Sequence, residues 1–195
     1  MEDFLDLLNQ VWTSGFLGIS MSEVLISLFI LIVSLIFRGV FANVGVNSLK
    51  KLTSRTETEL DDILLDSLKK PLGFIPITIG IYLITIFLPL SGLIDLIATN
   101  LVKALIVYTI FSALSNLVSP LFSILSNNTW LTTAMSVWLE RSSKVLVWVV
   151  GLAIILDIFG IEIGPLIAGL GLFSVAIALG AQDLFKNLIS GMLII

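Results

Sequence analysis

The sequence predicts an all-α polytopic membrane protein with about five transmembrane helices. Hydrophobic residues make up 57% of its 195 positions, charged residues only 12%, and the mean hydropathy is +1.13. Soluble domains are typically about 45–50% apolar and about 25% charged. So few charges cannot cover a surface that faces water, whereas a surface that faces lipid needs none. The composition therefore indicates a chain whose main solvent is the bilayer.

The composition also excludes several functions. The chain has no Cys and no His. It therefore lacks the residues for disulfide scaffolds, thiolate or imidazole metal sites, and catalysis by Ser-His or Cys-His pairs. Its net charge of −4 gives no electrostatic reason to bind nucleic acid. Because no span carries paired carboxylates or a nucleophile with its base, we expect no enzymatic activity, no cofactor and no metal site.

Five stretches are long and apolar enough to approach the length of a membrane span. A bilayer core of about 30 Å needs about 20 residues of helix. The stretches are residues 23–43, 71–94, 97–121, 144–160 and 165–195. The fourth is short and is flanked by Lys144 and Asp157, and the fifth is interrupted by Asp183 and Lys186.

The basic residues predict the orientation of these spans. Six of them follow the first span, namely Arg38, Lys50, Lys51, Arg55, Lys69 and Lys70. Arg141 and Lys144 lie on the same predicted side, and only Lys103 lies towards the other. Lys and Arg accumulate on the cytoplasmic side of membrane proteins. We therefore expect residues 1–20 to be an external amino-terminal segment and the carboxyl terminus to be cytoplasmic, in a plasma (inner) membrane.

Residues 56–70 predict a different kind of helix. Thr56 and Glu59 form a capping box at its start, and Pro71 is expected to stop it. Leu60, Leu64 and Leu68 recur at helical spacing and give it one apolar face. Such a helix can lie in the cytoplasmic interface of the membrane, or it can be a solvated helix that packs its stripe on neighbouring loops. The rest of residues 21–162 is expected to form peripheral transmembrane helices.

The last segment, residues 163–195, is unusually rich in small residues. They are Ala168, Gly169, Gly171, Ser174, Ala176, Ala178, Gly180 and Ala181. Helices in lipid associate mainly through close backbone approach, which small side chains permit. This density indicates a tightly packed helix, either in a symmetric assembly or in the bundle of a monomeric transporter.

One stripe of this helix has the pattern of a pore. Leu172, Val175, Leu179 and Gln182 recur at spacings of three, four and three residues. Repeated around a symmetry axis, the stripe would give apolar rings at Val175 and Leu179. Such rings can close a pore by expelling water.

Polar residues follow the stripe inside an otherwise apolar segment. They are Gln182, Asp183, Lys186 and Asn187. An ionisable residue is costly at this place unless it meets water or a partner. Gly180 and Gly191 are natural positions for the helix to bend.

Residues 176–195, AIALGAQDLFKNLISGMLII, are similar to the signature of the small-conductance mechanosensitive channel (MscS-like) family. That signature is a Gly/Ala-rich helix, then a Gln, a break, and Asn-Leu-x-x-Gly. The matching positions are Gln182, Asn187, Leu188 and Gly191. The stretch RTETELDD before the second span also resembles the longer, five-span branch of the family.

The resemblance implies a homoheptamer whose subunits each contribute one kinked, pore-lining last helix. The channel would be opened by membrane tension, conduct with low ion selectivity and release solutes in osmotic shock. Its partners would be its own copies, membrane lipids and permeating ions.

Roles for individual residues also follow from the resemblance. Val175 and Leu179 would form the constriction, and the kink would fall near Asp183, in the cytoplasmic pore end that contains Gly180 to Gly191. In the packing between subunits, Ala168, Leu172 and Ala176 would meet Gly171, Ser174 and Ala178 of the neighbour. Leu172 stands where the family usually has a small residue, and Asp183 where it often has Gly.

Family members continue from the pore helix into a cytoplasmic domain rich in β-structure. This chain ends at Ile195 within an apolar run, so we expect it to be a fragment without that domain. Two other functions remain open, a secondary transporter and a non-conducting membrane scaffold. A transporter would show related halves and a charged site at mid-membrane, whereas the charges here cluster near the predicted span ends.

Overall fold

The computed structural model describes residues 19–53, 59–128 and 132–193, and within these ranges its regular structure is helical. The helices are α2 (Met21–Thr53), α3 (Glu59–Ser67), α4 (Lys69–Leu72), α5 (Phe74–Phe87), α6 (Leu93–Asn128), α7 (Thr133–Ile158) and α8 (Gly164–Leu193). The all-α fold predicted from the sequence is confirmed. The predicted capping box at Thr56 and most of the predicted external segment 1–20 lie outside the described residues.

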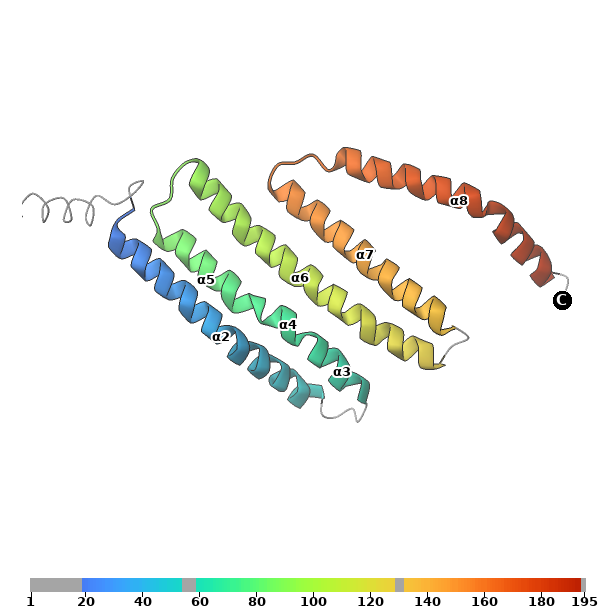
Figure 1. The fold of residues 1–195 in the computed structure, drawn as a ribbon, viewed down its shortest axis with the longest axis horizontal. Helices are drawn as coiled ribbons and strands as arrows, with labels where there is room; N and C mark the ends of the chain where they lie inside the picture. Colours follow the sequence, from blue (N-terminus) through green and yellow to red (C-terminus); the bar gives the residue numbers. More distant parts are fainter. Residues whose placement is uncertain (1–18, 54–58, 129–131, 194–195) are drawn as a thin grey trace, which may run out of the picture. The chain divides into compact units, whose positions relative to one another are not determined.

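The chain divides into two units, residues 1–159 and residues 160–195. In the first unit, α5 packs between α2 and α6, and α6 packs against α7 (Figure 1). The short helices α3 and α4 precede α5 and contact both α2 and α6. The second unit contains α8 and the loop that leads into it from Gly160.

Four of the described helical stretches are long and apolar enough to cross a membrane: Met21–Lys51, Lys69–Phe87, Leu93–Ile124 and Gly164–Gly191. Helix α7 lies outside this set because Glu140, Arg141, Lys144 and Asp157 leave too many charges in every window of 18 residues. Its apolar run between Lys144 and Asp157 corresponds to the short fourth span of the sequence analysis. The structure therefore has four to five helices that can span a membrane.

The boundary predicted at residue 94 for the second span is wrong. Helix α5 ends at Phe87, and Leu88 is extended, with ψ of 137°. Leu88 precedes Pro89, whose ring disfavours the helical conformation of the residue before it. Gly92, with a φ of 63°, completes the turn, and α6 begins at Leu93. The turn ends one span and starts the next within a stretch that is apolar throughout.

Pro71 does not stop the preceding helix in the way that the sequence analysis expected. The helix breaks earlier, at Leu68, and Pro71 lies buried inside α4. A proline cannot donate to the carbonyl group four residues before it, and its ring clashes with that group. For Pro71 this group belongs to Ser67, the last residue of α3, so the break falls there. Helix α3 contacts both α2 and α6.

An arginine and three aromatic rings form a row that links α2, α5, α6 and α7. The Arg38 guanidinium of α2 lies 5.0 Å from the ring centre of Phe74 on α5. Phe74 meets Tyr108 of α6 edge to face at 5.1 Å, and Tyr108 lies 5.4 Å from Trp148 of α7. Such contacts stabilise packed helices beyond the area they bury. The row fixes the order of the helices at one level of the bundle.

A polar cluster joins α6 to α7 nearer their connecting turn. Ser119 Oγ donates to Glu140 Oε1 at 2.7 Å, and Lys144 Nζ donates to the same carboxylate oxygen at 2.8 Å. Lys144 Nζ also donates to Ser119 Oγ at 2.5 Å. The cluster pairs two of the four charged residues of α7 and ties them to α6, which allows them to lie close to an apolar environment.

Close helix contacts in the first unit depend on glycine. A Cβ added at Gly151 of α7 would lie 2.7 Å from Cγ of Phe111 on α6, nearer than real contacts allow. A Cβ at Gly39 of α2 would meet nothing within 4 Å. The two glycines therefore offer a matched pair for testing the packing of α6 on α7.

We expect Gly151→Leu to destabilise the protein and Gly39→Leu to leave its stability unchanged or slightly higher. Overpacking costs about 1–3 kcal/mol, whereas an exposed Gly replaced by Leu in a helix gains propensity. Thermal unfolding in detergent, followed by circular dichroism, measures the difference. Equal melting temperatures for the two variants would contradict the close contact between α6 and α7.

Candidate pore-lining helix

All the residues that the sequence analysis proposed for the pore lie on α8. The helix runs without interruption from Gly164 to Leu193, with Pro165 in its first turn, where its missing N–H costs nothing. The hydroxyl of Ser174 donates to the carbonyl oxygen of Leu170 at 2.8 Å, so it needs no partner from outside the helix. The helix thus presents few unsatisfied polar groups along its first two thirds.

The predicted stripe occupies one narrow face of α8. At 3.6 residues per turn, Leu172, Val175, Leu179 and Gln182 lie within an arc of about 80°. Lys186 falls within the same arc, four residues after Gln182. Lys186 was predicted only as part of the cytoplasmic pore end, although its spacing from Gln182 already places it on the stripe. The face is thus apolar over two turns and then becomes polar and basic.

Small residues flank this face on both sides. Gly171, Ser174 and Ala178 lie on one side of the stripe, and Ala176 lies on the other, beyond Leu172, as helical spacing requires. A Cβ added at Gly171 would meet nothing within 4 Å. The flanks can therefore accept the backbone of another helix.

The apolar side chains of α8 are exposed in the single chain. Leu179 retains 66% of its accessible surface and Leu172 retains 78%. Residues outside the stripe are exposed as well, such as Ile177 with 55%. A helix that is apolar all round needs lipid or other helices on every side.

Four polar residues lie together towards the carboxyl end of α8: Gln182, Asp183, Lys186 and Asn187. Their side chains are exposed, and within the described part of the chain Asp183 and Lys186 form no ion pair. Charges inside an apolar segment are costly unless they meet water or a partner. This end of the helix is therefore suited to a water-filled space.

Gly180 and Gly191 are both helical, and the hydrogen-bonded helix continues through Asp183. The ribbon of α8 changes direction in its dark red carboxyl-terminal part (Figure 1). A sharp kink at Gly180 or near Asp183 therefore remains a prediction.

Comparisons with known proteins identify the class of protein to which this helix belongs. Residues 143–182 match the family model described as mechanosensitive ion channel, transmembrane helices 2/3. The match begins in α7, crosses the loop and includes α8 as far as Gln182. Both helices are thus similar to membrane spans of a mechanosensitive channel, which supports α7 as a membrane span in addition to the four named above.

Whole-chain relatives agree with this class. An uncharacterized MscS family protein of Aquifex aeolicus is 27% identical over 199 residues, covering 100% of this chain and 53% of the relative. The large-conductance mechanosensitive channel MscMJLR of Methanocaldococcus jannaschii is 31% identical, covering 84% of this chain and 48% of the relative. The small-conductance mechanosensitive channel MscMJ of the same organism is 28% identical, covering 91% and 53%. No solved structure matches the chain.

The chain is an MscS-like family protein. It spans about half the length of the curated relatives it matches. The family is one of mechanosensitive ion channels rather than of enzymes.

Proposed function

We propose that α8 lines the pore of a homo-oligomeric channel opened by membrane tension, and that this chain is the membrane half of its subunit. The observation that carries the proposal is the single face of α8 on which Val175 and Leu179 precede Gln182 and Lys186. A symmetric ring of such faces gives a narrow apolar neck that leads into a polar mouth. The resemblance to the family favours seven subunits and its five-span branch.

The proposed constriction consists of two apolar rings, at Val175 and Leu179. Water in a narrow apolar neck loses hydrogen bonds, and an ion there loses hydration. The closed state therefore blocks conduction even where the neck is not completely occluded by side chains.

Packing between subunits is proposed to use the small flanks of the stripe together with Ala168 and Leu172, which lie on the stripe itself. Ala168, Leu172 and Ala176 of one α8 meet Gly171, Ser174 and Ala178 of the next. Leu172 is the bulkiest of the six residues, so neighbouring α8 helices pack less closely at its level than elsewhere. Gly180, Asp183 and Gly191 are the proposed bending positions.

Tension acts on such a channel through its area in the membrane. An open state with a wider pore and tilted helices occupies more area, so stretch shifts the equilibrium towards it. Each subunit brings both Asp183 and Lys186 to the cytoplasmic mouth. Opposite charges in equal number favour low ion selectivity, which suits the release of solutes in osmotic shock.

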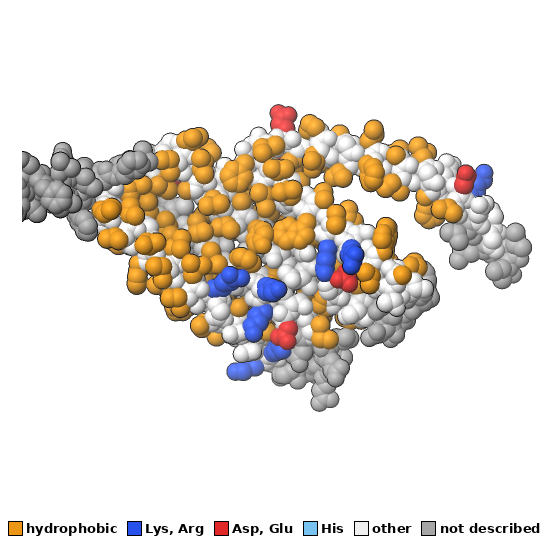
Figure 2. All heavy atoms as spheres, viewed as in Figure 1, with side chains coloured by type: hydrophobic (Ala, Val, Ile, Leu, Met, Phe, Trp, Pro, Cys, Tyr) orange, Lys and Arg blue, Asp and Glu red, His pale blue; other side chains and the backbone are white. Residues whose placement is uncertain are grey.

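The proposed orientation has the amino terminus outside and the carboxyl terminus in the cytoplasm. Lys50 and Lys51 end α2, Lys69 and Lys70 begin α4, and Arg141 lies in the first half of α7. The carboxyl ends of α2 and α6 lie at the same end of the antiparallel row in Figure 1, and the blue side chains of the first unit gather towards it in Figure 2. Lys and Arg favour the cytoplasmic side.

The orientation predicts the labelling of single cysteines in this Cys-free chain. Arg141→Cys should be protected from an impermeant maleimide added to intact cells, whereas Ile161→Cys, in the loop before α8, should react. Both positions are exposed. Reaction at position 141 with protection at 161 would reverse the orientation.

Stretch-activated patch recordings test the proposed function itself. They are best made on this chain joined to the remaining half of one of its relatives. A secondary transporter or a scaffold would give no such current.

A further inference from the structure

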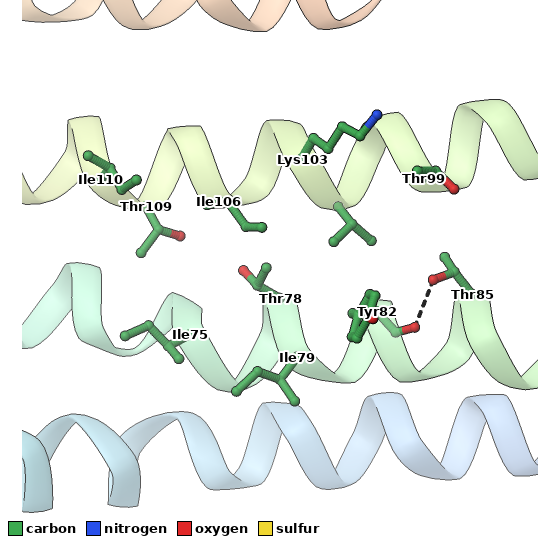
Figure 3. A pocket seen from close by; sticks show the side chains of 11 residues that line it. Ile75, Thr78, Ile79, Tyr82, Thr85, Thr99, Lys103, Ile106, Thr109 and Ile110 are labelled. Atoms are coloured by element: carbon green, nitrogen blue, oxygen red, sulfur yellow. Dashed lines mark hydrogen bonds between the residues drawn. The ribbon is translucent and has the colours of Figure 1, made fainter.

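A groove lies between α5 and α6. Its volume is about 570 Å³, within the range of about 300–1,000 Å³ that small-molecule sites occupy. Ile75 and Ile79 of α5 and Ile106 and Ile110 of α6 line one end of it (Figure 3). The groove is therefore apolar at this end and accepts hydrocarbon.

The other end of the groove carries its one charged residue, a lysine. Thr85, Thr99 and Lys103 lie there, and the Lys103 side chain runs along α6 towards Thr99 (Figure 3). The hydroxyl of Thr85 donates to the carbonyl oxygen of Tyr82 at 2.7 Å, shown by the dashed line. In Figure 3 the Lys103 ammonium lies over α6, on the side away from α5, and not between the two helices.

Lys103 is an isolated cation in a membrane span. It lies within the apolar stretch Leu93–Ile124, and it is the only Lys or Arg between Lys70 and Arg141. Its side chain is exposed, and among the described residues no carboxylate pairs with it. A charge in this position needs water or an anionic partner. Its long stem allows the ammonium to reach towards the membrane surface next to the α5–α6 turn.

We propose that this groove binds one anionic phospholipid, with an acyl chain between α5 and α6 and the phosphate at the Lys103 ammonium. The apolar lining of the groove matches the acyl chains of such a lipid, and the lysine beside it matches the phosphate. A free phosphate would not use the apolar end, and a neutral lipid would leave the lysine unpaired. The proposal requires that α5 and α6 span the membrane, and it does not depend on conduction.

Native mass spectrometry of the purified chain with added lipid tests the proposal. We expect dioleoyl-phosphatidylglycerol to be retained about fivefold more strongly than dioleoyl-phosphatidylcholine, since one Lys near a membrane surface contributes about 1 kcal/mol towards anionic lipid. Lys103→Gln should abolish this preference and Lys103→Arg should keep it. Lys69→Gln, an exposed lysine outside the groove, should also keep it.

A second variant locates the lipid. Ile106→Trp fills the apolar end of the groove and should lower the retention of both lipids. Ile106 is 47% exposed, so the larger side chain can be accommodated without disrupting the helix. Equal retention of the two lipids by the unchanged protein would overturn the proposal, as would equal losses in Lys103→Gln and Lys69→Gln. Full retention in Ile106→Trp, as expected if a second copy of the chain covers the groove, would overturn it too.

Discussion

Replacing Leu179 with Ser should make the channel open at lower tension or leak at rest. The substitution places one hydroxyl per subunit in the proposed neck, where each hydroxyl stabilises water. Shielding one leucine side chain from water contributes about 1.5–3 kcal/mol. Over a ring of subunits the closed state should therefore lose at least about 3 kcal/mol, roughly a hundredfold in the ratio of open to closed channels.

The matched control is Ile177→Ser. Ile177 is exposed on α8 like Leu179, with 55% of its surface against 66%, but helical spacing puts it on the opposite face. Both changes introduce the same side chain into the same helix, so a general loss of helix stability would affect them alike. Patch recordings under graded suction compare their activation curves. Equal shifts in the two variants would remove Leu179 from the gate.

Gly171→Leu should prevent assembly or raise the tension that opens the channel. Gly171 lies on the small flank of the pore face, where the backbone of a neighbouring α8 is proposed to approach. A leucine there overfills the contact, at roughly 1–3 kcal/mol for each interface by analogy with overpacked cores. A leucine is also a better helix former than glycine, so the effect cannot come from a weakened helix.

Counting subunits in lipid nanodiscs measures this effect. We expect seven for the unchanged protein, a smaller or mixed number for Gly171→Leu, and seven again for Gly171→Ala, whose side chain is still small. Unchanged assembly and gating in Gly171→Leu would mean that this flank faces lipid. One or two subunits in the unchanged protein would favour a transporter.

Much of the fold was predictable because hydropathy determines which segments leave water. Helix α8 was predicted close to where it lies, and the start of α2 was as well, whereas the first span was predicted to end at residue 43 and α2 continues to Thr53. The MscS-like signature in α8 was also readable, since it consists of residue types at fixed spacings along one helix.

The errors arose where local backbone chemistry interrupts an apolar run. Residues 71–94 are apolar on both sides of Pro89, so hydropathy alone could not reveal the turn that separates α5 from α6. Pro71 was given the correct effect at the wrong place, because a proline breaks the hydrogen bond to the residue four positions earlier. The charges of α7 hid its length, since the sequence does not show that Glu140 and Lys144 pair with each other and hydrogen-bond to Ser119 of α6.

Contacts and grooves between different helices could not be predicted from the sequence alone. The row from Arg38 through Phe74 and Tyr108 to Trp148 needs four helices in a particular order. The groove beside Lys103 needs α5 and α6 at a particular distance. The sequence marked Lys103 as the basic residue on the wrong side of the membrane, but only the packed helices give it an apolar groove.

Current through stretched membrane patches tests most directly whether membrane tension opens a pore lined by α8. The chain joined to the remaining half of one of its relatives is expressed in cells that lack other stretch-activated channels. We expect currents that rise steeply with suction and whose midpoint shifts in Leu179→Ser but much less in Ile177→Ser. Membrane-inserted protein that passes no current at any suction up to patch rupture would contradict the proposed pore.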